Sequence, residues 1–458
     1  MLSMTIDRLV ERLLFLGIFV LACLMPAQND TWWHLRAGYE MLADGRVLLH
    51  DRFSHTVFGQ SWANNGWLSQ VIFASIHRIG GLPLLTGVCA LAITSGMWLV
   101  YASTPGDRTR RVALLAGIVA GATVTWSLRP QAFTLLLLGA TIWLTTRQRW
   151  AALPLIFLLW ANLHSAVGLG LVVLGGAAAG HAVAEGRIPA RLIVVVALCT
   201  VATLATPQGI TYWPNIASSM QRSQLNDIAE WHAPELPPRN LAFWVAAAAL
   251  PALAMLRRRN VTGSRDWGRV WSALLLLPFA LRSMRNISPF LMAAAPAGGV
   301  LLRGHSTPAP APPPGRARTL LHTTVLTMAT MAATLLIARA WRSPPARMGW
   351  HPLSPGATRA IEGCRGPLYN TYADGGPIIF FAPKQRVLLD SRQDPYPVSL
   401  VQAEGEVERT GEYRALFKEY GINCAAVSPG APLRTRLERD GWITRFADDQ
   451  WIVLERPP

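Results

Sequence analysis

Apolar runs separated by short polar connections extend from the N-terminus to about residue 340. About eleven of them approach the length that a helix needs to cross the roughly 30 Å of a hydrocarbon core, although several are short. They lie near residues 13–27, 82–103, 111–128, 131–146, 150–163, 165–184, 190–206, 240–256, 268–283, 288–302 and 319–340. This pattern predicts a mainly α, polytopic membrane helix bundle of about 11 spans.

After residue 340 the pattern changes to short alternating elements. The predicted strands are "GPLYNTYADGGPIIFF", "QRVLLDSR", "NCAAVS" and "QWIVLERP", and the predicted helices are "SLVQAEGEVERTGEYRALFKEYG" and "APLRTRLERDG". This alternation is typical of a small α/β domain. The chain is therefore expected to divide into a transmembrane domain at 1–340, with an external loop at 28–67, and a soluble α/β domain at 341–458.

Composition agrees with a membrane protein, because 51% of the residues are hydrophobic, only 15% are charged, and the mean hydropathy is +0.28. The first apolar run follows Arg8 and Arg12, as in a secretory signal, but no small-residue cleavage site with a polar exit comes after it. Trp32 and Trp33 instead indicate an interfacial anchor. We expect this run to be an uncleaved span.

Basic residues outnumber acidic ones, 42 to 26, and they gather in alternate connections such as "GDRTRR", "EGRIPAR" and "RRRNVTGSRDWGR". This distribution predicts a cytoplasmic N-terminus, with the C-terminal domain on the opposite, periplasmic side of a bacterial inner membrane. It does not form the continuous basic face that nucleic-acid binding needs. The chain also lacks GxxxxGK[ST], GxGxxG, HExxH and CxxC motifs, so nothing supports ATP-driven transport, dinucleotide redox or zincin proteolysis.

The residues that could carry chemistry fall in the connections assigned to the external side. They are Asp30, His34, Asp51, Arg129, His164, Glu230, His232, Arg282 and Arg285. Ionisable groups near hydrocarbon are costly and are typical of functional sites, so this set predicts one shared external site. The alternative is that interfacial loops simply collect polar residues.

Asp30 and His34 are spaced i, i+4, so in a helix both project from one face, with Trp33 beside them. An aspartate can take the proton of an attacking hydroxyl, and an indole can stack on a sugar ring. Asp30 could instead cap the helix that follows "NDT". Asp51 lies in the same loop and is a substrate-binding candidate, with a local ion pair to Arg52 as its alternative.

Arg129, Arg282 and Arg285 suit a lipid-linked phosphate arriving from the bilayer, because guanidinium groups bind phosphate bidentately. Snorkelling to lipid headgroups is the other interpretation. His164 and the pair Glu230 and His232 are candidate ligands of a divalent metal, Mg²⁺ or Mn²⁺, but no close spacing makes a strong metal site. No cofactor is firmly predicted.

In the C-terminal domain, "LLDSRQDPY" places Asp390, Arg392 and Asp394 just past a predicted strand, where ligand sites are common in α/β sheets. An internal Asp–Arg ion pair that fixes the loop is the alternative. Cys364 and Cys424 could form a disulfide on the external side or remain as two unpaired buried thiols.

Short motifs in a fixed order resemble a bacterial family of multispanning proteins related to GT-C glycosyltransferases. These motifs are D-x-W-W-H-L-R-x-G at 30–38, "DRFSHT", "W…GWL", "RPQ", "WANLH", "TPQG", "EWHAP", "RSMRN" and "YADGG…VLLDSR". The resemblance covers nearly the whole chain. It implies a polyprenyl-phosphate-linked sugar as donor and an acidic base in the first external loop, a position that only Asp30 matches. Many GT-C enzymes have a second acid beside the first, whereas Asn29 and Thr31 flank Asp30 here, which weakens the case for a metal.

The leading hypothesis is a membrane glycosyltransferase that moves a sugar from a polyprenyl-phosphate carrier to an acceptor on the external face. Asp30 would be the base, the three arginines would bind the phosphate, His34 and Glu230 would shape the site, and Trp33 would stack on sugar. The alternatives are a non-catalytic GT-C-like subunit that binds a protein partner through its outer domain, and a lipid or polysaccharide transporter. Charged residues that concentrate at one boundary argue against the transporter.

Overall fold

The computed structural model describes residues 5–226, 228–304, 315–342 and 345–457. The chain folds into two compact units. The helical unit comprises Met1–Met25, Pro83–Ile210 and Ala229–Pro344, and the mixed unit comprises Pro26–Leu82, Thr211–Ile228 and Pro345–Pro458. Residues 28–67, predicted to form an external loop, therefore fold together with the C-terminal residues.

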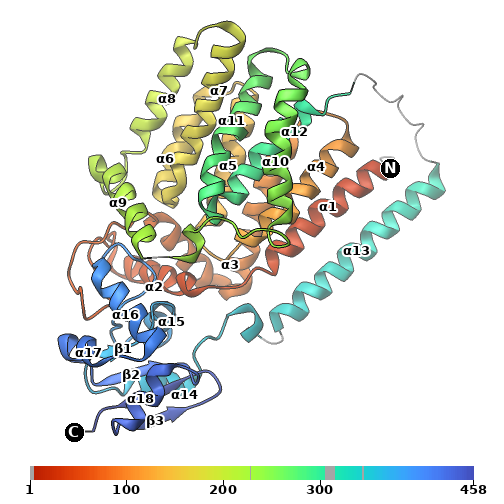
Figure 1. Cartoon of the computed structure of the whole chain (residues 1–458). Coiled ribbons are helices and arrows are strands. Elements are labelled where there is room, and N and C mark those ends of the chain that lie inside the picture. Colours follow the sequence, from red (N-terminus) through yellow and green to blue (C-terminus); the bar gives the residue numbers. More distant parts are fainter. Residues whose placement is uncertain (1–4, 227, 305–314, 343–344, 458) are drawn as a thin grey trace. The chain divides into compact units, whose positions relative to one another are not determined.

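The helical unit is a bundle of α-helices (Figure 1). Its described helices are α1 (Ile6–Cys23), the later part of α3 (Trp67–Ser103), α4 (Arg108–Ala122), α5 (Gln131–Thr146), α6 (Leu153–Leu163), α7 (Gly168–Glu185), α8 (Ala190–Ala202), α10 (Leu241–Leu256), α11 (Gly263–Arg282), α12 (Ile287–Leu301) and α13 (Arg316–Arg342). Each run predicted as a span overlaps one of these helices. The helix α3 bends at Gly80 and Gly81, where the backbone leaves the helical region, and Leu82 follows this break.

Three helical stretches of the described chain are long and apolar enough to cross a membrane: Trp67–Ser103, Ser165–Glu185 and Arg316–Arg342. Four shorter apolar helices accompany them, at Gln131–Thr146, Trp150–Leu163, Ala190–Ala202 and Leu241–Leu256. The mainly helical class is confirmed, whereas the count of about 11 spans stays a prediction. Of the loop predicted to be cytoplasmic at 303–318, residues 305–314 lie outside the described residues.

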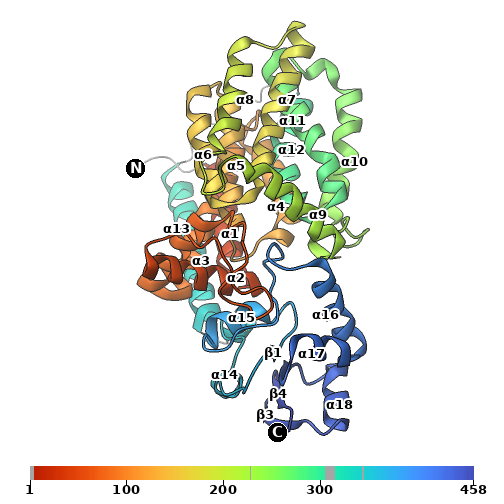
Figure 2. The same ribbon diagram turned by 90° about the vertical axis from the view of Figure 1, so that its left-hand side faces the viewer.

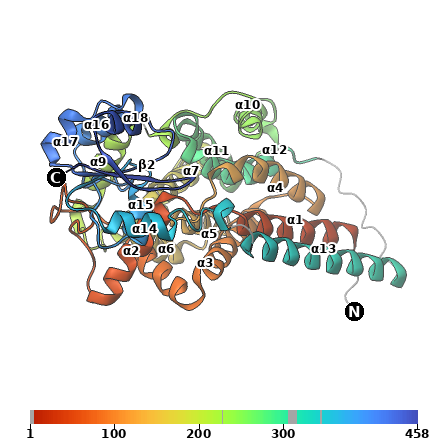
Figure 3. The same cartoon turned by 90° about the horizontal axis from the view of Figure 1, so that it is seen from below.

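Small residues bring helices of this unit close together. A Cβ at Gly180 of α7 would lie 2.3 Å from the backbone nitrogen of Gly268 in α11, and one at Gly176 would lie 2.3 Å from the hydroxyl of Ser272. Small side chains at helix contacts are typical of membrane bundles. The helix α13 runs beside α1 (Figure 3), and its Trp341 indole donates to the Cys23 carbonyl at 3.0 Å.

The mixed unit contains a four-stranded sheet in the order β1-β2-β4-β3 (Figure 2). Its strands are β1 (Leu368–Tyr369), β2 (Cys424–Val427), β3 (Ile443–Ala447) and β4 (Ile452–Glu455), with β1 parallel to β2 and the other pairs antiparallel. Its helices are α2 (Asn29–Asp44), the first part of α3, α9 (Tyr212–Leu225), α14 (Pro355–Glu362), α15 (Gly375–Phe381), α16 (Val398–Thr410), α17 (Arg414–Tyr420) and α18 (Pro432–Arg439).

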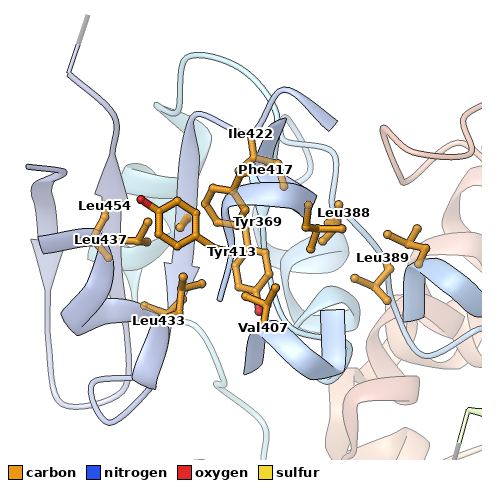
Figure 4. Close-up of a cluster of buried hydrophobic side chains, with 14 of the residues drawn as sticks. Tyr369, Leu388, Leu389, Val407, Tyr413, Phe417, Ile422, Leu433, Leu437 and Leu454 are labelled. Atoms are coloured by element: carbon orange, nitrogen blue, oxygen red, sulfur yellow. The ribbon is translucent and has the colours of Figure 1, made fainter. Parts of the chain in front are cut away.

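An apolar core joins the sheet to the helices of the mixed unit. Tyr369, Phe417, Leu437 and Leu454 are buried together with Leu388 from the segment that precedes the "DSR" loop (Figure 4). A further buried cluster contains side chains from α2, α15 and β4. The apolar side chains of α2 thus contribute to the same packed unit as the C-terminal domain.

The structure corrects part of the predicted sheet. The stretch "PIIFF", predicted as strand, belongs to the helix α15, and β3 was not predicted. The segment around Val387 lies outside the named sheet, because its backbone bonds to the first loop: Val387 N–H donates to the Phe53 carbonyl at 3.0 Å, and His55 N–H donates to the Val387 carbonyl at 3.0 Å. Cys364 and Cys424 form a disulfide, with Cα atoms 5.9 Å apart.

Candidate functional site

Asp30 lies in the first turn of α2. The helix begins at Asn29, its N-cap is Gln28, and the Gln28 N–H donates to the Thr31 hydroxyl at 3.0 Å. The interpretation of Asp30 as the cap is therefore wrong. A carboxylate in the first turn interacts favourably with the helix dipole.

Two donors hold one oxygen of the half-buried Asp30 carboxylate. The Trp33 indole N–H lies 3.2 Å from Oδ1 of Asp30 and 3.0 Å from Oγ of Ser391, and the Ser391 hydroxyl donates to the same Oδ1. Ser391 is 361 positions away in the chain, so no local pattern predicts this contact. Hydrogen bonds to an ionised acceptor are strong, so they fix the orientation of the carboxylate.

Trp33 is only 8% exposed and packs in the core of the mixed unit. Its ring lies 3.6 Å from the ring of His34, centroid to centroid, and 5.9 Å from that of Trp62. His34 is also buried, at 9% exposure. This burial differs from the expectation that Trp33 stacks on a sugar, and it gives the indole a role in orienting Asp30.

Asp51 is fully buried in an ion pair with Arg392 rather than paired with Arg52. Its Oδ1 lies 2.5 Å from Nη2 of Arg392, and the same guanidinium lies 2.6 Å from Oδ2 of Asp390. Arg52 instead pairs with Asp44 at 2.5 Å, so the local Asp51–Arg52 pair is wrong. The alternative interpretation of "LLDSRQDPY" as an internal Asp–Arg pair is confirmed. This role of Asp51 also differs from the expected contact with substrate.

Aromatic rings and a tyrosine complete the surroundings of Arg392. Its guanidinium carbon lies 4.7 Å from the ring centroid of Trp62 and 5.0 Å from that of Phe53, and the Tyr396 hydroxyl donates to Oδ2 of Asp390 at 2.6 Å. Charge pairing and cation–π contact together offset the desolvation of a buried guanidinium. The loop is therefore anchored on both sides of Ser391.

Two consecutive glycines of the "YADGG" motif let α15 approach this region. A Cβ at Gly376 would lie 2.1 Å from the carbonyl oxygen of Asn29, and a Cβ at Gly375 would lie 2.3 Å from the carbonyl oxygen of Leu389. Any side chain there would push on the residue before Asp30 or on the loop before Ser391. The motif thus has a steric explanation near the candidate base.

The helical unit holds a separate cluster of charged residues. Nη2 of Arg129 lies 3.0 Å from Oε2 of Glu230, and Nη1 of Arg285 lies 3.6 Å from Oε1 of the same carboxylate. The Arg285 guanidinium also stacks 4.9 Å above the Trp231 ring, and the Ser283 hydroxyl donates to the Glu230 carbonyl at 3.0 Å. Two cations around one anion leave a positive charge, which suits a phosphate.

Two further predicted residues, His164 and Arg282, also belong to the helical unit. His164 follows α6, and its Nδ1 lies 2.9 Å from the Thr134 hydroxyl, which accepts a bond from the Trp160 indole at 2.9 Å. Arg282 is the last residue of α11 and is exposed. The single site predicted for all these residues stays a prediction.

Within the described parts of the chain, no group of three or more His, Cys, Asp and Glu side chains lies close enough to hold a metal ion. Asp30 contacts the Trp33 indole and the Ser391 hydroxyl. A divalent metal stays a prediction, and no step below uses one.

No protein-family model matches the chain, and no functionally curated protein matches its sequence. Solved structures do match its fold. The apo oligosaccharyltransferase of Archaeoglobus fulgidus aligns with a TM-score of 0.54 at 10% identity, over 91% of this chain and 69% of that one. The oligosaccharyltransferase AglB of the same organism, in complex with an inhibitory peptide and a dolichol-phosphate, aligns with a TM-score of 0.53 at 11% identity over the same shares. ArnT from Cupriavidus metallidurans in the apo state aligns with a TM-score of 0.51 at 13% identity, over 97% of both chains.

The fold is GT-C-like. Both kinds of neighbour are GT-C glycosyltransferases, so the resemblance found in the sequence is confirmed at the level of the fold. At 10 to 13% identity the likeness reaches no further than the fold.

Proposed function

We propose that this chain is a membrane glycosyltransferase that moves a sugar from a polyprenyl-phosphate carrier to an acceptor hydroxyl on the external face of the membrane. The GT-C-like fold supports this class of reaction, and AglB in its complex with a dolichol-phosphate is a neighbour of that fold. The observation that carries the proposal is the half-buried Asp30 carboxylate, held by Trp33 and Ser391 in the first turn of α2.

In the proposed reaction, Asp30 accepts the proton of the acceptor hydroxyl while the hydroxyl oxygen attacks the anomeric carbon. The bond between that carbon and the carrier phosphate breaks, and the phosphate leaves with its electron pair. A positioned general base contributes about 10²- to 10⁴-fold to such a rate.

Arg129 and Arg285 would bind the leaving phosphate, with Arg282 as a further cation from the end of α11. Glu230 forms ion pairs with the first two arginines and so acts as their counter-ion. A phosphate that enters must compete with this carboxylate. Such competition keeps the lipid phosphate from binding too tightly after transfer.

Replacement of Asp30 by Asn tests the proposal. Membranes with Asp30→Asn should transfer labelled sugar at least about 100-fold more slowly than wild type. The matched control is Asp44→Asn at the far end of the same helix, where an exposed pair with Arg52 is lost and the rate should be unchanged. Wild-type transfer by Asp30→Asn would overturn the assignment, and absence of transfer by the wild-type protein with every lipid-linked donor would overturn the proposed class.

A further inference from the structure

The loop Asp390–Asp394 lies next to the candidate base, although it comes from the C-terminal end of the chain. Its Ser391 hydroxyl donates to Oδ1 of Asp30 and accepts the Trp33 indole N–H at 3.0 Å. Trp33 also reaches the same Oδ1, at 3.2 Å. Three polar groups thus form a closed triangle, in which the carboxylate cannot rotate without breaking two bonds.

Buried charges fix the residues on either side of Ser391. Arg392 binds Asp390 through Nε, at 2.8 and 3.0 Å from its two oxygens, and reaches Asp51 through Nη2. The side chains of all three residues are fully buried. A bidentate pair of this kind sets the geometry of the backbone that carries it, because moving either partner leaves a charge buried without its counter-charge.

The other end of the loop is held by α9. The Ser223 hydroxyl donates to Oε1 of Gln393 at 2.5 Å, and the Arg222 guanidinium donates to the Asp394 carbonyl. Gln393 has φ of 64°, a left-handed conformation that a residue with a Cβ adopts only when its surroundings impose it. Backbone strain of this kind is concentrated at functional sites.

We infer that Ser391 is a positioning residue for the proposed transfer: it orients the Asp30 carboxylate, and the buried Asp51–Arg392–Asp390 network holds Ser391 in place. The C-terminal domain is then part of the catalytic machinery, not a separate partner-binding module. This inference rests on the proposed function of Asp30.

The first test compares Ser391→Ala with Ser391→Thr, which restores a hydroxyl, and with Ser399→Ala, an exposed serine of the nearby α16. Ser391→Ala should lower kcat by about 10- to 100-fold and leave KM within about twofold, because a misaligned base affects the reacting geometry more than binding. Ser391→Thr should recover most of the rate, and Ser399→Ala should match wild type.

The second test is a double-mutant cycle with Trp33→Phe, which removes the indole donor but keeps an aromatic ring. Because both donors act on one carboxylate oxygen, the combined loss in kcat should be clearly different from the product of the two single losses. If Ser391→Ala keeps the wild-type kcat while Asp30→Asn is inactive, the inference is overturned and the proposed function stands. If Asp30→Asn itself transfers at the wild-type rate, the proposed function fails instead. Thermal unfolding of each variant distinguishes a variant that fails to fold from one that folds with a misaligned Asp30 carboxylate. If the variants fold and the loss in kcat of the double mutant equals the product of the two single losses, this result also counts against the inference.

Discussion

Removal of the Arg392 guanidinium should unfold the mixed unit more readily than removal of any exposed arginine. In Arg392→Met the carboxylates of Asp51 and Asp390 stay buried without their counter-charge. Breaking a buried pair in this way costs about 3 to 5 kcal/mol. Asp51 keeps its bonds from Ser54, at 3.1 Å from the backbone N–H and 2.7 Å from the hydroxyl. These bonds offset part of the cost, so we expect a loss in the lower half of that range.

That loss is measurable as a change in Tm. A loss of 1 kcal/mol lowers Tm by about 2 to 4 °C for a unit of 150 to 250 residues, so Arg392→Met should melt about 6 °C or more below wild type. The assay is thermal unfolding of the full-length protein in detergent, with hydrogen exchange read in peptides that cover β2 and β4.

Arg52→Met is the matched control. Its side chain is 46% exposed and pairs with Asp44 and Glu40 at the surface, where such pairs contribute about 0 to 1 kcal/mol. Its Tm should fall by no more than about 4 °C. If Arg392→Met melts within that same range, the buried network does not stabilise the mixed unit, and the argument that it holds Ser391 loses its basis.

Three further changes test other parts of the structure. Gly376→Ala should destabilise the mixed unit by about 1 to 3 kcal/mol and slow transfer, because the added Cβ meets the carbonyl oxygen of the residue before the candidate base. Gly405→Ala is the control and should be neutral or slightly stabilising, since a Cβ there has nothing within 4 Å. Unfolding and transfer assays that give both variants the same result would contradict this prediction. Burial raises the pKa of Glu404 to about 8, so the stability of the folded protein is full below about pH 4.5 and falls as the pH rises toward 8. Glu404→Gln should therefore gain up to about 4 kcal/mol over wild type between pH 5 and pH 8, whereas Glu406→Gln, at an exposed position, should gain nothing. Equal curves of Tm against pH for the two variants would refute this prediction. Glu230→Gln should retain more polyprenyl phosphate through purification, as quantified by mass spectrometry, and unchanged retention would contradict its role as a counter-ion.

Much of the helical unit could be predicted because a long apolar run has few alternatives to a helix in a membrane. The mixed unit was harder, since short apolar segments are ambiguous between strand and helix. "PIIFF" has the β-branched and aromatic residues of a strand, but Gly375 and Gly376 allow the segment to pack tightly as the helix α15. In this segment, tertiary packing decides the secondary structure against the local strand propensity.

Part of the candidate site could likewise be predicted from the sequence, and part of it could not. Asp30 and His34 are spaced i, i+4, so their shared face could be predicted on the condition that the segment is a helix, and the structure shows that helix as α2. Ser391 left no local signal, because its partner is Asp30 and a contact over 361 positions appears only in the folded chain. The burial of Trp33 and Asp51 likewise depends on residues from the C-terminal end that no periodicity connects to them.

The most direct test of the central claim follows the carrier lipid itself. Purified protein in lipid nanodiscs is supplied with a polyprenyl-phosphate sugar fraction and an acceptor extract, and mass spectrometry follows the appearance of sugar-free polyprenyl phosphate. The account predicts that wild type and Asp44→Asn release the free carrier and that Asp30→Asn does so at least about 100-fold more slowly. Equal release by Asp30→Asn, or no release by any of the three proteins, would contradict it.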